Sequence, residues 1–163
     1  MRSKDGGNME SDIGLPTANI DLVRRAFEAL NRGELDACVQ LMVPDFIANL
    51  PGVPQPMRGR DAWKQGAQEF RTAFPDLHIR IEDIFATGDR VAVRLSFRGV
   101  HRGSFHSIPA TGRPIAFTSI EIYRVSDGRL AEEWVSPDMS TLMRQITASS
   151  DAQPTDRATT HQS

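Results

Sequence analysis

The chain has a single cysteine in 163 residues, so no disulfide can form within it and no cysteine-based metal site can be assembled. That residue, Cys38, stands among apolar residues of an expected helix, which favours a place in the core. No stretch approaches the roughly 18 apolar residues of a membrane span, and the amino terminus lacks the apolar run of a signal peptide. We therefore expect a cytoplasmic protein that does not cross a membrane.

An excess of charge of one sign is also missing. The 19 Lys and Arg residues nearly balance 21 Asp and Glu residues, and the basic residues are scattered, so a nucleic-acid partner is not expected. His101 and His106 lie five residues apart in a glycine-rich segment. This spacing lacks the helical geometry and the acidic neighbour of a metal site, so no metal is expected.

The composition, 39% hydrophobic and 25% charged, fits one domain with a substantial core. Residues 1–18 and 148–163 are polar and poor in apolar anchors, which predicts two disordered tails around a domain at 19–147. In that domain the apolar spacing of three and four indicates helices, the first capped by Asn19 and ended by Gly33. The expected helices cover 20–33, 34–42 and 61–74, with a short strand at 45–50 and a loop or lid at 51–59.

The second half of the chain alternates apolar and polar residues as strands do. Gly88-Asp89 and Ser126-Asp127-Gly128 are typical of tight turns between such strands. Three helices followed by an antiparallel meander predict an α+β fold, in which the helices pack on the concave side of a curved sheet. The expected strands cover 77–85, 91–97, 114–125 and 129–135, followed by a short closing helical turn at 138–146.

Acidic residues interrupt these strands. Glu121 stands between Ile120 and Ile122 in a central strand, so its carboxylate must line a cavity, pair with a cation or face solvent. The pocket and the ion pair remain equal alternatives at this point. Burial would move the protonation equilibrium of such a carboxyl toward neutral pH, as general acid/base chemistry requires.

Two further acidic positions have structural explanations. Asp83 falls on the apolar face of its strand, and a buried pair with Arg94 or Arg98 on the next strand is the favoured interpretation. Glu132 and Glu133 are adjacent, so their side chains point to opposite faces and only one of them can line a pocket.

Several motifs together resemble the SnoaL-like polyketide cyclases: GDRVAVR from Gly88, the segment GVHRGSFHSIPATGRPI from Gly99, and IEIYRVSDGRLAEEW from Ile120, followed by Asp138. The segment FPDL from Phe74 also matches the family, and the resemblance extends from about residue 19 to about residue 145. It implies the cone-shaped α+β fold of the nuclear transport factor 2-like superfamily. That superfamily also holds ketosteroid isomerases, epoxide hydrolases and members without a known reaction.

The resemblance further implies ring closure by an intramolecular aldol reaction without metal or organic cofactor, with one aspartate as acid and base. By position Asp138 is the best match for that aspartate, although a helix N-cap is an equal alternative for it. Asn49 and Gln68 are counterparts of a pocket asparagine and glutamine. Near the family's pocket histidine this chain has Glu121, Tyr123 and Arg124, and Glu121 is the reserve base.

Two other residues are candidates for substrate contact. His106 can reach the pocket mouth as a hydrogen-bonding group, and Trp63 can form part of an aromatic wall. The expected substrate is a hydrophobic, polyoxygenated small molecule. Epoxide hydrolysis, ketosteroid-type isomerisation and a non-catalytic binding or assembly module remain alternatives. The exposed sheet favours a homodimer or a higher homo-oligomer.

Overall fold

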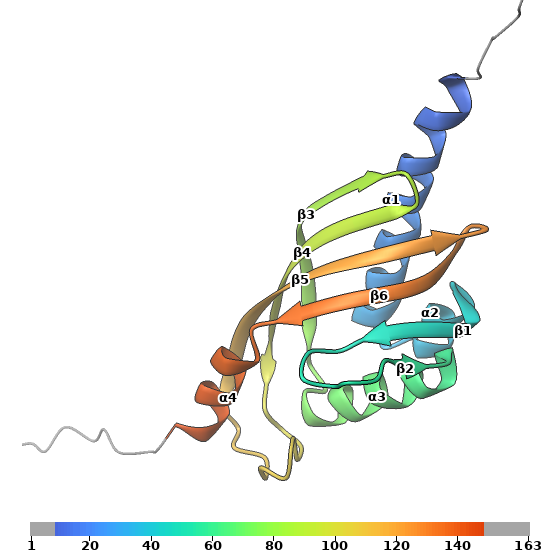
Figure 1. Cartoon of the computed structure of the whole chain (residues 1–163). Coiled ribbons are helices and arrows are strands. Elements are labelled where there is room, and N and C mark those ends of the chain that lie inside the picture. The colour runs from blue at the N-terminus through green and yellow to red at the C-terminus, as the bar shows by residue number, and fades with distance from the viewer. Residues whose placement is uncertain (1–8, 149–163) are drawn as a thin grey trace, which may run out of the picture.

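The computed structural model describes residues 9–148. Figure 1 shows α1, α2 and α3 on one side of a strongly curved sheet and α4 beyond the carboxyl end of β6. The α+β fold class is therefore confirmed. No helix in the described range is long and apolar enough to cross a membrane. The elements are α1 (Met9–Arg32), α2 (Leu35–Gln40), β1 (Met42–Asn49), β2 (Met57–Arg58), α3 (Arg60–Ala73), β3 (His78–Thr87), β4 (Arg90–Val100), β5 (Pro114–Ser126), β6 (Arg129–Pro137) and α4 (Met139–Thr147).

The sheet has six strands in the order β2-β1-β6-β5-β4-β3. Strands β3 to β6 form the expected antiparallel meander, but β1 pairs with β6 in parallel. The antiparallel meander is therefore as expected, and the parallel pair makes the complete sheet mixed. No hairpin joins β1 to β6, since α3 and the whole meander lie between them, so their relative direction is not fixed by a tight turn.

The amino-terminal boundary also differs from the expectation. Helix α1 begins at Met9, so residues 9–18 are helical rather than part of a tail. Asn19 lies inside α1 instead of capping it, and its Nδ2 donates to the carbonyl of Gly88 over 3.3 Å. The remaining parts of the two predicted tails, 1–8 and 149–163, lie outside the described residues.

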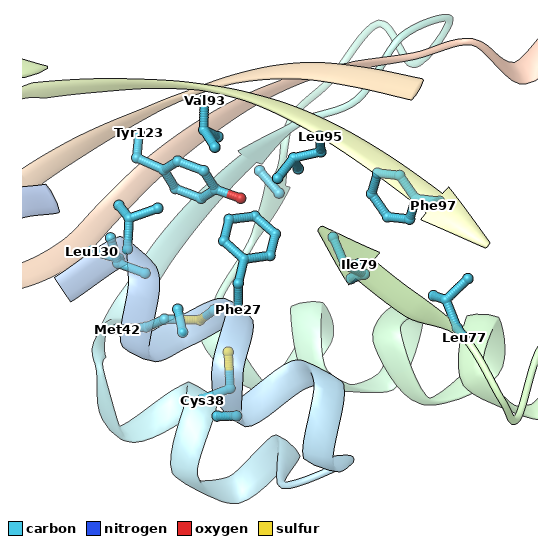
Figure 2. Packing of buried hydrophobic residues seen from close by; sticks show 14 of the residues in the cluster. Phe27, Cys38, Met42, Leu77, Ile79, Val93, Leu95, Phe97, Tyr123 and Leu130 are labelled. Atoms are coloured by element: carbon cyan, nitrogen blue, oxygen red, sulfur yellow. The ribbon is translucent and has the colours of Figure 1, made fainter. Parts of the chain in front are cut away.

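The inner face of the sheet carries the core. Along β5, buried and exposed side chains alternate, and the inward set is Ile115, Phe117, Ser119, Glu121, Tyr123 and Val125. Figure 2 shows Tyr123 beside Phe27 of α1, whose ring meets it edge-on at 6.1 Å between centroids. Cys38 is fully buried in the same cluster, as the sequence predicts. Helix α1 therefore covers the strand that carries Glu121.

The outer face of the sheet is partly apolar. Phe85, Ala92, Ile122 and Trp134 stand opposite one another on β3, β4, β5 and β6 and form a continuous row. Ile120, 59% exposed, lies beside this row. Ion pairs flank it, with Asp83–Arg94 at 2.6 Å on one side and Glu132–Arg124 at 3.1 Å on the other.

The partner of Asp83 is therefore the expected Arg94, but the pair is exposed rather than buried. A register shift between Ile81 and Asp83 breaks the alternation of β3. Asp83 consequently does not share the buried face of Ile79, and Phe85 is 65% exposed.

The segment 101–113 between β4 and β5 docks on the carboxyl end of α3. The backbone N–H groups of Arg102 and Gly103 both donate to the carbonyl of Ala73, over 2.9 and 3.0 Å. A Cβ at Gly103 would lie 2.3 Å from the carbonyl oxygen of Thr72, which leaves no space for a side chain. This close approach holds the segment against the helix.

We expect Gly103→Ala to lower the free energy of unfolding by about 1–3 kcal/mol, because backbone atoms must shift to accept the methyl group. The matched control is Gly66→Ala in α3, where a Cβ meets nothing within 4 Å and should stabilise the helix by about 0.5–1 kcal/mol. Urea denaturation of both variants measures these opposite signs. Equal effects would show that the contact with Thr72 does not constrain the segment.

Candidate active site

Two glutamates meet on the inner face of the sheet. Glu121 and Tyr123 are two residues apart on β5 and point to the same side. Glu133 of β6 stands directly opposite Tyr123 in the register. Glu121 and Glu133 are only 7% and 5% exposed, so the strand pairing gathers two carboxyl groups and a phenol in the protein interior.

Neutral donors surround the two carboxyl groups. Glu121 Oε1 accepts from the hydroxyl of Ser119 at 3.0 Å, and Oε2 accepts from the hydroxyl of Tyr123 at 2.5 Å. Glu133 Oε1 accepts from the indole Nε1 of Trp63 at 3.0 Å. Helix α3 thus supplies the donor for Glu133, and β5 supplies both donors for Glu121.

No ion pair within residues 9–148 includes Glu121 or Glu133. Arg124, the basic residue nearest to them along β5, pairs with Glu132 on the other face of the sheet. Of the alternatives for Glu121, the ion pair is therefore not the one observed. A buried carboxylate without a cation is unfavourable, so its proton is held more tightly than in water.

The pKa values follow from this environment. Burial and, after it, the negative charge of Glu121 together raise the pKa of Glu133 to about 8, against the opposing effect of hydrogen bonds from Trp63 and Tyr123. Burial also raises the pKa of Glu121, against the hydrogen bonds from Tyr123 and Ser119. The two carboxyl groups therefore titrate as a coupled pair, and both keep their protons to higher pH than exposed glutamates do.

Asp138 lies outside this cluster. It is exposed and caps α4, where its carboxylate accepts from the backbone N–H of Thr141 at 3.0 Å and from the hydroxyl of Thr141 at 2.6 Å. Hydrogen bonds from Thr141 and Ser140 lower its pKa. Of the two roles that the sequence leaves open, the structure shows the contacts of the N-cap.

Three other residues that were predicted to contact the substrate also lie apart from the two buried glutamates. Asn49 donates to Glu132 Oε1 at 3.1 Å and to the backbone carbonyl of Glu133 at 2.9 Å, so its side chain links β1 to β6. Gln68 is exposed on α3 and lines a surface depression between α2 and α3. His106 is exposed at the tip of segment 101–113. The structure does not bring these side chains to the buried carboxyl groups.

Of the predicted site residues, Glu121, Tyr123 and Trp63 do come together, with Glu133 at the centre of their contacts. The sequence analysis restricted the pocket to one of Glu132 and Glu133 without choosing between them. The sequence analysis did not single out Ser119, although its side chain points to the same side of β5 as that of Glu121. Two surface depressions, on the outer side of α1 and between α2 and α3, do not reach the pair.

Residues 20–146 match the family model of the SnoaL-like polyketide cyclases, and the chain belongs to this family. Aklanonic acid methyl ester cyclase DauD of Streptomyces sp. (strain C5) is 29% identical over 131 residues, covering 78% of this chain and 80% of DauD. DnrD of Streptomyces peucetius, also an aklanonic acid methyl ester cyclase, is 28% identical, covering 80% of this chain and 91% of DnrD.

Solved structures agree on the fold. The crystal structure of IdmH from Streptomyces antibioticus, described as a putative polyketide cyclase, is 35% identical with a TM-score of 0.71 and covers 78% of this chain and 97% of IdmH. A SnoaL-like protein from Jannaschia sp. CCS1 has a TM-score of 0.78 at 23% identity, covering 83% of this chain and 96% of that one. The second similarity supports the fold alone.

The raised pKa of Glu133 makes a prediction about stability. The folded chain keeps a proton that the unfolded chain releases above pH 4.5, so the free energy of unfolding falls as pH rises from about 4.5 to about 8 and then levels off. Glu133→Gln removes this penalty, and we expect the variant to be more stable than the original chain at pH 8, by an amount that vanishes near pH 4. Urea denaturation across this pH range measures the effect.

The control is the neighbouring Glu132→Gln, which loses the ion pair with Arg124 on the outer face and should gain no stability at pH 8. If both variants behaved alike, Glu133 would not carry an unfavourable buried charge.

Proposed function

We propose that this chain is a cofactor-free polyketide cyclase that closes a ring by an intramolecular aldol reaction, with Glu121 and Glu133 as its base and acid. The observation that carries the proposal is the pair of buried carboxyl groups without a cation partner among the described residues, one of them with a pKa of about 8. Carboxyl groups tuned toward neutral pH suit proton transfer at carbon and oxygen. Membership of the family and relatives named as methyl ester cyclases support it.

We assign the two roles from the contacts of the pair. Glu121 accepts two hydroxyl hydrogen bonds, and its charge raises the pKa of Glu133, so Glu121 is the ionised base. It removes a proton from a carbon that flanking carbonyl groups activate. The resulting enolate attacks a second carbonyl carbon of the same chain, and protonated Glu133 transfers its proton to the alkoxide that forms. One proton enters the protein and one leaves it, so no cofactor is required.

The surroundings favour a hydrophobic substrate with several oxygens. Val93 faces Glu121 across β4 and β5, and Phe46 packs edge-on against Trp63 with ring centroids 6.5 Å apart. The side chains beside the pair are thus apolar, which favours a carbon-rich substrate, and holding its two reacting carbons together removes much of the entropic barrier to ring closure. Ser119 and Tyr123 are the nearest neutral groups for a developing oxyanion.

We expect Glu121→Gln to lower kcat for ring closure by about 10²- to 10⁴-fold, the usual contribution of a general base. The measurement is the absorbance change when an anthraquinone-type polyketide methyl ester is converted to its cyclised product. The matched control is Asp138→Asn, because asparagine also caps helices and should leave kcat nearly unchanged.

The opposite pattern, with Asp138→Asn inactive and Glu121→Gln active, would assign the chemistry to Asp138. A chain that binds the ester tightly but forms no product would instead be a binding module of the same fold. Incorporation of oxygen from labelled water into a diol would favour epoxide hydrolysis.

We also propose that the outer face of the sheet joins two copies of the chain. Phe85, Ile122 and Trp134 of the apolar row are exposed and Ala92 is half-buried, and one acidic and one basic residue lie on each side of the row. A two-fold axis can bring the acids of one copy to the basic residues of the other, and the partner of this surface is therefore a second copy.

We expect Ile120→Glu to convert a dimer to a monomer, because it places a charge directly beside the apolar row. Sedimentation equilibrium measures the mass, with Val53→Glu in the exposed 51–59 loop as the control for an added charge elsewhere. A monomeric original chain, or a dimer that survives Ile120→Glu, would show that this face does not associate.

A further inference from the structure

Tyr123 lies between the two buried glutamates of the candidate active site. It follows Glu121 by two positions on the inward face of β5 and stands directly opposite Glu133 of β6. Its hydroxyl donates to Glu121 Oε2 at 2.5 Å, and the same phenol is hydrogen-bonded to Glu133. The ring packs edge-on against Phe27 of α1, which holds it in this place (Figure 2). One hydroxyl group therefore connects the two carboxyl groups.

The proposed ring closure leaves the two glutamates with their protonation states exchanged. Glu121 ends the reaction protonated, because it has taken the proton from carbon, and Glu133 ends it ionised. A second reaction can start only after a proton has returned from Glu121 to Glu133. Both residues are buried, so a path through the protein interior would return this proton without exchange with solvent.

A group on such a path must both donate and accept, and it must contact both carboxyl groups. The indole Nε1 of Trp63 contacts Glu133, but an indole N–H can only donate. The hydroxyl of Ser119 can do both, but it donates to Glu121 and lies on the far side of that residue along β5. The hydroxyl of Tyr123 meets both conditions.

The phenol keeps its proton at neutral pH. Burial and, after it, the negative charges of Glu121 and Glu133 raise the pKa of Tyr123 well above its ordinary value. Cys38 of α2 also faces this group, and burial raises the pKa of its thiol to about 12. Neither side chain stores a negative charge, so the phenol can release its proton only while it receives another.

We propose that Tyr123 is a proton relay that resets the glutamate pair after each ring closure. Glu121 donates its new proton to the phenol oxygen, and the phenol O–H donates its own proton to the carboxylate of Glu133. Two O–H bonds break and two form, no electron is transferred, and Tyr123 is neutral before and after the step. The relay rests on the proposed function, because it uses the assignment of Glu121 as base and Glu133 as acid.

The kinetic test compares the first turnover of Tyr123→Phe with its later turnovers. Phenylalanine keeps the ring against Phe27 and loses only the hydroxyl. A variant equilibrated in buffer starts with its protons in place, so the first ring closure needs no relay. Rapid mixing with excess anthraquinone-type polyketide methyl ester should give a burst of about one product per chain, followed by turnover roughly tenfold slower or more. The original chain should show no such burst.

The matched control for this test is Ser119→Ala. It removes the other hydroxyl that donates to Glu121 but changes no contact with Glu133. Its first and later turnovers should therefore slow by the same factor, and no burst should be seen.

A second measurement needs no substrate. Tyr123 is the only tyrosine in the chain, so tyrosine labelled with carbon-13 at Cζ gives a single NMR signal. If the phenol is coupled to both carboxyl groups, its chemical shift should show a step at about pH 8, where Glu133 titrates. Glu133→Gln should remove this step, and the neighbouring Glu132→Gln should keep it.

The relay is wrong if Tyr123→Phe shows no burst, whether its turnover is normal or absent from the first cycle. It is also wrong if the Tyr123 signal does not respond to Glu133. Either result, together with an inactive Glu121→Gln, would leave the two glutamates in their roles as base and acid. Normal turnover of Glu121→Gln would instead reject the proposed function, and the relay with it.

Discussion

The organisation of this protein depends on two carboxyl groups held in the interior without a cation. Burying such groups is unfavourable, so the remaining contacts of the fold must offset their cost. Phe27 of α1 packs on Tyr123, and Trp63 of α3 donates to Glu133, so the helices that bury the core also hold the pair. An arrangement that lowers stability persists where function needs it, which is why the pair is the strongest sign of chemistry in the molecule.

The sheet separates charges by face. On the outer face, Glu132 accepts from Arg124 and Asn49, and Asp83 pairs with Arg94. On the inner face, Glu121 and Glu133 receive hydrogen bonds only from Ser119, Tyr123 and Trp63 among the described side chains. Because the pleat sends adjacent residues to opposite sides, two consecutive glutamates on β6 have entirely different environments. The ion pair with Glu132 holds Arg124 on the outer face of the sheet. The guanidinium group therefore does not pair with Glu121 or Glu133, whose pKa values stay raised.

The helices, the meander and the family could be predicted from local patterns, because apolar periodicity and turn residues act over a few positions. Local patterns could not predict which of Glu132 and Glu133 points to the inner face. A register shift between Arg124 and Val125 adds Ala131 to β6, so that Tyr123 faces Glu133. Without the shift, Glu132 would point inward. A similar shift exposes Asp83 and Phe85 on β3. Bulges depend on strand twist and packing across the sheet, and composition alone does not reveal them.

The position of Asp138 shows a related limit. Its place after Trp134 suggested a catalytic aspartate, but the residues that follow it, Ser140 and Thr141, supply the donors of a helix cap. A carboxylate that solvent reaches and three hydrogen bonds stabilise is a weak base. Glu121 also accepts hydrogen bonds, yet burial outweighs them in setting its pKa. Hydrogen bonds alone therefore do not distinguish an exposed capping carboxylate from a buried one with a raised pKa. The distinction lies in burial, which in this chain is decided by which face of β5 and β6 a residue occupies.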